Sequence, residues 1–491
     1  MAMFQLSLAA LQLLLHRHGQ RLFIVVWLLV LPSIIDAADI RVWSHVPLTK
    51  IAFGSCHKRK HVVGNKDGMG TIWDAIRKED PQAFLWTGDA VYPSSRRIAP
   101  LAQLKHEYEQ MQTNSSIGYS NFRPPLGIFG TWDDHDYGAN DAGKELNLKQ
   151  ERRRSFFNFL NYSQELQTKL ANRSGLYHTI DFVHAETVDD QYHHHHSHAV
   201  LKVIVLDTRW NRDQHCIPSV AAMIPLGSAI SCLTRWFVAG ITKSGTSSRS
   251  FCSSSSTILG EEQWNWLSKE LETSTAQVHV ILSSIQVLST NPAMEGWGHF
   301  PKEQERLLQL LNSKRPSGLV LLSGDVHHAE ILDPSPSNKS TFLEVTSSGL
   351  THSCTMPFYG KLCEPLLTRF GTHRRLESDY FLGRNFGTLD VDWRNRRLSI
   401  AVHDHGGETV LTTGWRSFSW DALTQEELNH VARTVDGHLL PTLIRWTYIG
   451  FVLFALAAFL WFMVQKYIRS VNAGTNRNGL AAVAEPRKKY D

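Results

Sequence analysis

The sequence predicts an α/β fold in which packed sheets carry helices on their outer faces, with one transmembrane helix near the carboxyl end. From Pro47 onward, short apolar runs alternate with amphipathic segments, the pattern of alternating strands and helices. Several of these runs end in a glycine followed by a residue that can bind metal. The 491 residues are 42% hydrophobic and 20% charged, with a net charge of +4. This composition is typical of a globular protein and carries no nucleic-acid-binding signature.

The predicted elements follow one another between residues 47 and 402. Strands are expected at Lys50–Phe53, Ala83–Thr87, Ala199–Leu206, Val278–Leu282, Gly318–Leu322, Phe342–Thr346, Thr388–Trp393 and Leu398–Val402. Helices are expected at Thr71–Glu79, Leu101–Gln112, Leu146–Leu160, Glu261–Glu272 and Gln304–Leu311. Residues 211–257 lack a sustained period and are expected to form a surface insertion. The run His193–His196 with His198 is interpreted as a solvated loop, with a metal site as the alternative.

The two ends of the chain indicate a membrane protein of the secretory pathway. Residues 1–37 join a basic start to an apolar run and a small residue, Ala37, which predicts a signal peptide or a retained anchor. The uncharged stretch Trp446–Val464 is long enough to cross about 30 Å of hydrocarbon, so a transmembrane helix is expected at 441–465. Basic residues follow it, which places 466–491 in the cytosol as a basic tail and 38–440 in the lumen.

Further features of the sequence fit a type I, single-pass glycoprotein of the endoplasmic reticulum. The tail ends with Lys488 and Lys489 followed by two residues, which resembles a dilysine signal read by coat proteins; a solvated basic terminus is the alternative. Glycosylation sequons lie at Asn114, Asn161, Asn172 and Asn338. The cysteines are Cys56, Cys216, Cys232, Cys252, Cys354 and Cys363. Their pairing stays open, although Cys354 with Cys363 would close a short loop.

The stretch Thr131–Gly138 concentrates three carboxylates and an imidazole between two glycines. It follows a short apolar run and is expected to be a loop at the end of a strand. Carboxylates packed this closely need a neutralising cation or a proton, so a metal site is the hypothesis and a solvated acidic turn the alternative. Cys56, Asp89 and Asp325 occupy comparable loops after other strands. Convergence of these strand ends would create one site.

Three motifs occur in the order found in the calcineurin-like metallophosphoesterases, which include the purple acid phosphatases: Gly88–Tyr92, Trp132–Asp136 and Gly324–His327. The chain more narrowly resembles the PhoD-like alkaline phosphatase and phosphodiesterase family, through Phe53–Cys56, Asn140–Asp141, Leu206–Arg209 and Asn385–Gly387. The resemblance covers about Ile51 to Val402. It implies a two-layer β sandwich flanked by helices, with residues 38–440 forming a lumenal metallophosphatase domain.

The resemblance also implies roles for individual residues. Asp89 matches the carboxylate that bridges two metals, and Tyr92 matches a phenolate ligand. Asp134, Asp325, His327 and Cys56 match further metal ligands, while His135 matches the leaving-group histidine and Asp136 the acid that orients it. The chain departs from the wider superfamily, since it lacks an Asp-x-His motif after the first strand and the separate histidine before the last motif.

The donor types predict two unlike metals. Cys56, Tyr92 and His327 with Asp89 offer thiolate, phenolate and imidazole donors, which favour iron. The second site shares Asp89 and adds carboxylates, which suit calcium, manganese or magnesium. Cys56 has an alternative as a disulfide partner, which would remove one ligand.

The predicted function is hydrolysis of phosphate esters on the lumenal side by a hydroxide that two metals activate. His135, held by Asp136, would assist the leaving group. Arg209 would clamp a phosphoryl oxygen or form a salt bridge with Asp207 or another carboxylate, and Asp133 has no assigned role. The alternatives are a phosphodiesterase directed at phospholipids and a non-catalytic lumenal binding protein that keeps the fold.

Overall fold

The structure is a computed structural model that describes residues 38–62, 70–93, 98–190, 193–215, 227, 230–235, 256–291, 293–335, 342–355, 360–369, 373–419, 454, 457 and 459–465. The chain forms two units, residues 1–436 and 437–491. The predicted signal peptide, the cytosolic tail, Cys216, Cys252 and Asn338 lie outside the described residues, as does most of the predicted span 441–465. Among the residues that are described, no helix has the length and apolar character needed to cross a membrane.

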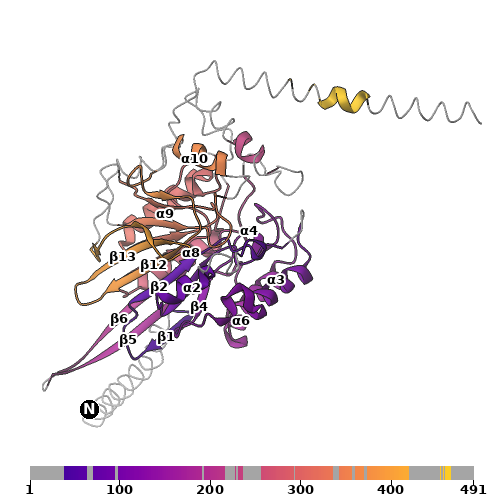
Figure 1. The fold of residues 1–491 in the computed structure, drawn as a ribbon. Helices are drawn as coiled ribbons and strands as arrows, with labels where there is room; N and C mark the ends of the chain where they lie inside the picture. Colours follow the sequence, from indigo (N-terminus) through magenta and orange to yellow (C-terminus); the bar gives the residue numbers. More distant parts are fainter. Residues whose placement is uncertain are drawn as a thin grey trace, which may run out of the picture. The chain divides into compact units, whose positions relative to one another are not determined.

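Two mixed β-sheets form the first unit (Figure 1). The eight-stranded sheet runs in the order β1 (Ile40–Ser44), β5 (His178–Asp190), β6 (His193–Val205), β7 (Val278–Leu282), β8 (Leu319–Ser323), β10 (Leu343–Ser347), β9 (Ala329–Leu332) and β11 (Tyr380–Phe381). The seven-stranded sheet runs β14 (Thr409–Thr412), β13 (Arg397–Asp404), β12 (Asn385–Asp392), β2 (Lys50–Gly54), β3 (Ala83–Thr87) and β4 (Ile128–Thr131), and β15 (Arg416–Ser417) pairs with β13. Each sheet contains a block of parallel neighbours, β2–β3–β4 in one and β6–β7–β8–β10 in the other.

Alternating side chains of the eight-stranded sheet show how the layers are arranged. Val203 and Val280 belong to the same core as Phe53 of β2 and Leu389 of β12, so one face packs against the other sheet. Their neighbours along the strands, such as Ile204, belong to a second core with helices α8 (Glu261–Thr273) and α9 (Pro301–Lys314). The period of two in a strand thus buries both faces, and the α/β prediction of packed sheets with helices outside is confirmed.

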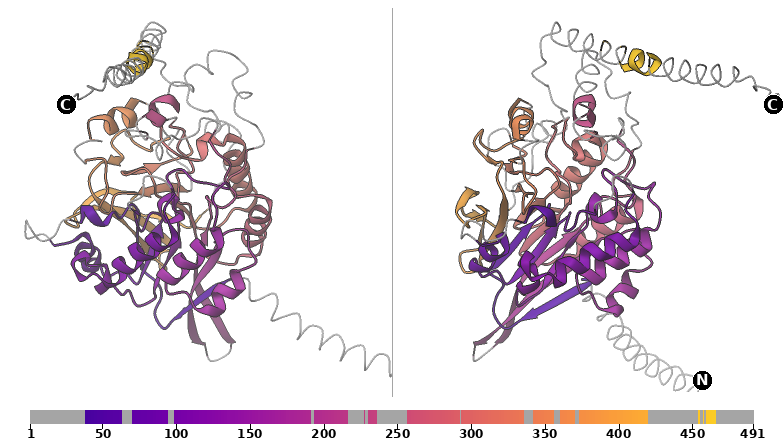
Figure 2. Two further views of the ribbon diagram at one scale, coloured as in Figure 1. Left: turned by 90° about the vertical axis from the view of Figure 1, so that its right-hand side faces the viewer. Right: turned by 45° about the vertical axis from the view of Figure 1, so that its right-hand side comes forward.

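Further helices are α2 (Ile72–Lys78), α3 (Leu101–Thr113), α4 (Asp134–Tyr137), α5 (Lys149–Phe159), α6 (Gln164–Leu170) and α10 (Gly360–Arg369), and 3-10 turns occur at Arg59–His61, Ser115–Ile117, Tyr119–Asn121 and Trp297–His299. Helices α2, α3 and α5 bury residues in the core shared with β2, β3 and β4. Figure 2 shows these purple helices on a different side of the sheets from the rose-coloured α8 and α9. Every predicted strand and helix between residues 47 and 402 is present, with ends that differ by a few residues.

Two local predictions were wrong. Thr131–Gly138 is not a simple loop, because Asp134–Tyr137 form a single helical turn. The histidine run is not a loop either: it is the first part of β6, paired with β5 as far as Asp190 opposite His193. The two strands continue as a long ribbon beyond the rest of the sheet (Figure 1). The continuous antiparallel register of the hairpin outweighs the low β-propensity of its polar residues.

Candidate metal centre

The predicted ligand loops meet because each follows the carboxyl end of a strand in a parallel block. Cys56 follows β2, Asp89 follows β3 and Asp134 follows β4, whereas Asp325 follows β8 of the other sheet. The approach between the sheets is close at Gly324, where an added Cβ would lie 2.5 Å from both the Ser55 hydroxyl and the Thr87 carbonyl oxygen. Ends of parallel strands lie at one edge of a sheet, and here two such edges face each other.

Backbone strain marks four of the predicted ligand positions. Cys56, Asp89, Asp325 and His327 have φ angles of 62°, 51°, 75° and 62°, in the left-handed region that non-glycine residues seldom occupy. Each such residue costs about 1–3 kcal/mol and persists only where the surroundings hold it. Backbone hydrogen bonds do so here: the N–H of His57 donates to the Asp89 carbonyl at 2.9 Å. Strain of this kind is concentrated at functional sites.

Cys56, Tyr92 and His327 form one side of the centre, which we call the thiol side. The Tyr92 hydroxyl donates to Asp89 Oδ2 at 2.6 Å, and Cys56 Sγ lies 3.7 Å from the same oxygen. Ser348 links Cys56 to His327. Its hydroxyl lies 3.1 Å from Cys56 Sγ and accepts the backbone N–H of His327 at 3.0 Å. Cys56 is buried and free, so the disulfide alternative is not what the structure shows. Burial raises the pKa of this thiol to about 12 and also raises the pKa of Tyr92, so a bound cation would be needed to favour their anions.

Asp133, Asp134 and Asp325 form the carboxylate side, where one oxygen from each lies within 4.8 Å of the others. Asp134 Oδ2 accepts the Asp141 N–H at 2.6 Å. Burial, together with neighbouring acidic groups, raises the pKa of Asp89 and Asp325 well above the ordinary range. Such a cluster is unfavourable unless protons or cations neutralise it.

Orphaned polar atoms show that this donor set fits a metal. Asp133 Oδ2, Asp134 Oδ1 and His327 Nδ1 are buried and have no hydrogen-bond partner within the described parts of the chain. Asp89, Asp134 and His135 form a second close group, so Asp89 adjoins both sides. Buried acceptors normally have partners, and cations would supply the missing ones.

Asp136 does not have the orienting role expected from the resemblance. Its carboxylate accepts the N–H groups of Ala90, Val91 and Asp133 at 3.1–3.2 Å and the Tyr108 hydroxyl at 3.2 Å. These bonds hold the Asp89 loop against the helical turn α4, and none of them comes from the His135 imidazole. Asp136 therefore positions the Asp89 loop.

His135 lies beside Tyr92, with ring centroids 4.0 Å apart, and its side chain is 26% exposed. Its Nε2 is 4.0 Å from Asp134 Oδ1, and its backbone N–H donates to Asp89 Oδ1 at 3.1 Å. Burial lowers the pKa of the imidazole. The side chain is therefore neutral at pH 7 and partly accessible, at the boundary between the two sides of the centre.

Arg209 is fully buried and is held by carboxylates. Its Nε donates to Asp133 Oδ1 at 2.6 Å, and its two Nη atoms donate to Glu295 at 2.9 and 3.2 Å. The alternative of a salt bridge therefore describes the structure better than a phosphoryl clamp, with Asp133 and Glu295 as partners in place of Asp207. Asp133 gains a role here, because the Ser284 hydroxyl also donates to it at 2.6 Å.

Sequence reasoning missed several neighbours of the centre that belong to no recognised motif. His352 has its ring centroid 4.3 Å from that of His327, and its Nδ1 is 3.2 Å from His61 Nδ1. Glu295 and Ser348 reach the site from loops after β7 and β10. These residues are distant in the chain, and the sequence around them gave no signal that could have identified them.

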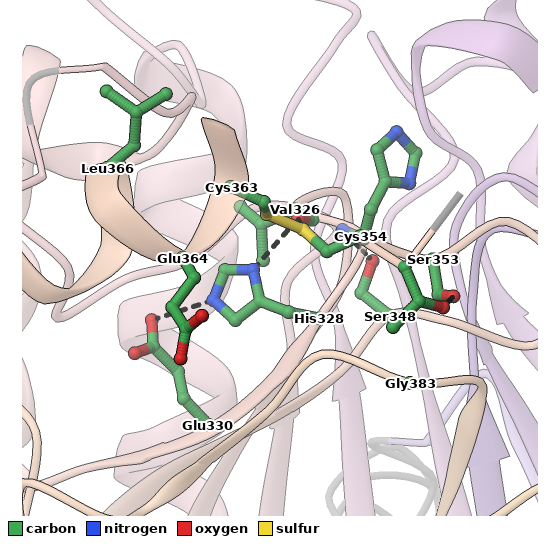
Figure 3. Close-up of a disulfide and its surroundings, with 12 residues drawn as sticks. Val326, His328, Glu330, Ser348, Ser353, Cys354, Cys363, Glu364, Leu366 and Gly383 are labelled. Carbon is green, nitrogen blue, oxygen red and sulfur yellow. Dashed lines mark hydrogen bonds and ion pairs between the residues drawn. A yellow bond between two sulfur atoms is a disulfide. The ribbon is translucent and has the colours of Figure 1, made fainter. Parts of the chain in front are cut away.

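The structure joins Cys354 and Cys363, the pair that would close a short loop, in a disulfide (Figure 3). It ties α10 to the loop after β10, and the Cys354 N–H donates to the His327 carbonyl at 2.7 Å. Beside the disulfide, His328 Nδ1 lies 2.9 Å from the Val326 carbonyl oxygen, and His328 Nε2 lies 3.3 Å from Glu330 Oε1. This covalent link supports the strained backbone at His327.

Comparison with known proteins supports the resemblance. Residues 51–402 match a family model described as PhoD-like phosphatase. Alkaline phosphatase D of Bacillus subtilis (strain 168) is 23% identical over 315 residues, which make up 58% of this chain and 46% of the relative, so the match spans about half of that relative. A solved structure entitled "Structure of PhoD" aligns with a TM-score of 0.44 at 15% identity, covering 79% of this chain and 77% of that one. Because the family model matches well over half of its residues, the chain belongs to the PhoD-like phosphatase family.

Proposed function

We propose that this protein is a metal-dependent hydrolase of phosphate esters, with two cations held between the thiol and carboxylate sides. The observation that carries the proposal is that possible metal-ligand atoms from both sheets converge, and that several of them are buried without a hydrogen-bond partner among the described residues. Membership of the PhoD-like phosphatase family supports it. Strained backbone at Cys56, Asp89, Asp325 and His327 surrounds the same centre, as is common at active sites and ligand clamps.

The proposed ligands are Cys56, Tyr92 and His327 on the thiol side and Asp134 and Asp325 on the carboxylate side, with Asp89 shared between them. Cations bound there would activate water and offset the charge that develops on a phosphoryl group. The donor types support iron on the thiol side and calcium, manganese or magnesium on the carboxylate side. Asp136 supports this arrangement by holding the Asp89 loop through the Ala90 and Val91 N–H groups.

His135 is the proposed donor to the leaving oxygen. Its lowered pKa leaves a neutral ring that still carries one N–H, and its partial exposure lets that N–H reach a substrate. The contact with Tyr92 fixes the ring beside the shared Asp89. In this role His135 would act without Asp136, since Asp136 bonds elsewhere.

The test is metal analysis of the purified full chain combined with turnover of p-nitrophenyl phosphate and bis(p-nitrophenyl) phosphate. We expect bound iron together with a second cation, and hydrolysis of at least one ester that the Asp89→Asn variant loses. The enzyme proposal fails if neither ester is hydrolysed with iron and calcium or manganese supplied.

Cys56→Ala tests the thiol ligand separately. We expect this variant to lose iron and to retain the cation on the carboxylate side, because its thiol contributes only to the thiol side. A Cys56→Ala protein with full iron content and full activity would rule out the ligand role.

The lumenal location is also a proposal, supported by the uncharged stretch Trp446–Val464 and by the sequons Asn114, Asn161 and Asn172. Glycosidase treatment of the protein from its own membranes should lower its apparent mass. Protease applied to intact microsomes should remove only the tail that ends in Lys488 and Lys489. Complete digestion of the site-bearing unit under those conditions would place that unit in the cytosol instead.

A further inference from the structure

Among the described residues, Lys58 is a cation without a carboxylate partner beside the thiol side of the metal centre. It is half-buried, and its Nζ lies 5.5 Å from the centroid of the Tyr92 ring. Within the described chain it forms no ion pair with a carboxylate, whereas its neighbour Arg59 is paired with Glu107 through two bonds of 3.0 Å. A half-buried ammonium without a carboxylate partner is unusual, because burial of a charge is unfavourable unless an opposite charge compensates it.

The backbone of Lys58 is fixed by Thr351. The Lys58 N–H donates to the Thr351 hydroxyl at 2.7 Å, and that hydroxyl in turn donates to the Lys58 carbonyl at 3.0 Å. The position therefore belongs to the rigid framework of the centre, because the Thr351 N–H also approaches the Cys56 carbonyl at 3.3 Å. A lysine held in this way presents its charge at a defined place, while its long side chain can still adjust to a ligand.

The surroundings of Lys58 on this side are neutral or cationic. His352 and His61 contact each other, and burial lowers the pKa of both. Arg384, also half-buried, donates to the His61 carbonyl at 3.0 Å. Asp89 is the acidic group that acts on Lys58, and bound cations would neutralise it. The metal-loaded centre would then leave Lys58 without an anion.

We propose that Lys58 binds a non-bridging oxygen of the substrate phosphoryl group, and that its charge favours dianionic phosphate monoesters over monoanionic diesters. The inference rests on the proposed function of the same centre. It assigns to Lys58 the anion contact that Arg209 cannot make, because the guanidinium of Arg209 is engaged by Asp133 and Glu295. An additional positive charge stabilises a dianion more than a monoanion at equal distance, which gives the preference its sign.

The experiment compares the full chain with its Lys58→Met, Lys58→Arg and Lys60→Met variants. Lys60 is the matched control because it lies in the same turn, carries the same charge and is exposed. Calorimetric titration of metal-loaded protein with inorganic phosphate should show binding about tenfold to a hundredfold weaker for Lys58→Met, the usual effect of losing a hydrogen bond to a charged group. Lys58→Arg should retain most of the affinity, Lys60→Met all of it, and every variant its metal content.

Turnover provides the second readout. Relative to wild type, Lys58→Met should lower kcat/KM for p-nitrophenyl phosphate several-fold more than for bis(p-nitrophenyl) phosphate. The Lys58 assignment is overturned by unchanged phosphate affinity in Lys58→Met, by equal losses for the two esters, or by a metal-loaded wild type that does not bind phosphate. If phosphate binding depends on Lys58 but wild type hydrolyses neither ester, Lys58 keeps its anion site and the proposed hydrolase function fails.

Discussion

The two sides of the metal centre differ in what surrounds them. On the carboxylate side, Asp133 is fixed by the buried guanidinium of Arg209, which also binds Glu295. On the thiol side, Tyr92 faces the half-buried Lys58, which has no carboxylate partner among the described residues. One side is thus closed by internal ion pairs, and the other borders residues that are partly exposed and mostly neutral or cationic.

The difference indicates a division of tasks. Internal ion pairs hold carboxylates in place before a cation binds, which preorganises a site for hard cations. Unpaired positive charge at a partly exposed edge suits an incoming anion. The centre would therefore combine a rigid carboxylate side with a more open thiol side that would receive the phosphoryl group.

Arg209→Met should have the largest effect, and on stability. The substitution leaves the buried Asp133 without its guanidinium partner, whereas Glu295 keeps Arg212 at 3.3 Å. Breaking a buried pair by removing one partner costs about 3–5 kcal/mol. Urea unfolding followed by circular dichroism would measure the loss. The double variant Arg209→Met with Asp133→Asn should recover part of it, because the uncompensated carboxylate is then absent. A loss below about 1 kcal/mol would show that the carboxylate side is not held by this network.

Asp89→Asn should affect both sides together. Asp89 contacts the Tyr92 hydroxyl and lies 3.7 Å from Cys56 Sγ, and it also groups with Asp134 and His135. Residues that merely support metal ligands change affinity about tenfold to a hundredfold, so loss of a shared ligand should exceed about a hundredfold. Metal content after dialysis would measure the loss of affinity. Asp325→Asn is the comparison, because it removes a ligand of the carboxylate side only. Equal iron content in Asp89→Asn and wild type would contradict the sharing.

His135→Ala should lower kcat about a hundredfold for an ester with a poor leaving group, because one hydrogen-bond donor to the leaving oxygen is lost, and it should leave metal content unchanged. The effect should be much smaller for p-nitrophenyl phosphate, whose leaving group needs little assistance. Asp136→Asn should show the opposite pattern, with weakened metal retention, because Asp136 holds the Asp89 loop. If both variants lower kcat alone and to the same extent, the two residues act as a pair, and the separation inferred from the structure is wrong.

Metal binding should weaken as the pH falls, by about tenfold per pH unit for each proton that the cation displaces. The sign follows from the pKa shifts. Burial raises the pKa of the shared Asp89, that of Asp325 on the carboxylate side and that of Cys56, to about 12, on the thiol side. A raised pKa favours the protonated form of each group in the metal-free protein, and a cation that binds there displaces the proton. Iron on the thiol side should therefore remain pH-dependent into the alkaline range, after calcium binding has levelled off. Calorimetric titration with each cation in buffers of different ionisation enthalpy would count the protons released. Identical pH profiles for the two cations would contradict the predicted difference between the thiol and carboxylate sides.

Much of the fold could be predicted from local pattern. Fully apolar runs such as Ala83–Thr87 and Leu319–Ser323 form central strands, since a strand buried on both faces needs no polar alternation. The amphipathic helix α8 lies where its periodicity placed it. The histidine run was misjudged because a strand at the end of a long hairpin is determined by its pairing partner and not by its own residues.

The sequence by itself placed Cys56, Asp89, Asp134 and Asp325 in loops after strands, because glycine and the apolar pattern mark those strand ends. The family resemblance added Tyr92 and His327 to the expected ligands. Only the tertiary structure decided how the neighbouring charges are shared. Arg209 and Asp136 lie in the expected motifs. Arg209, however, pairs with Glu295, and Asp136 accepts the Ala90 and Val91 N–H groups. Ion pairs and hydrogen bonds of buried groups depend on which donors reach them across the fold, and no local pattern fixes that choice.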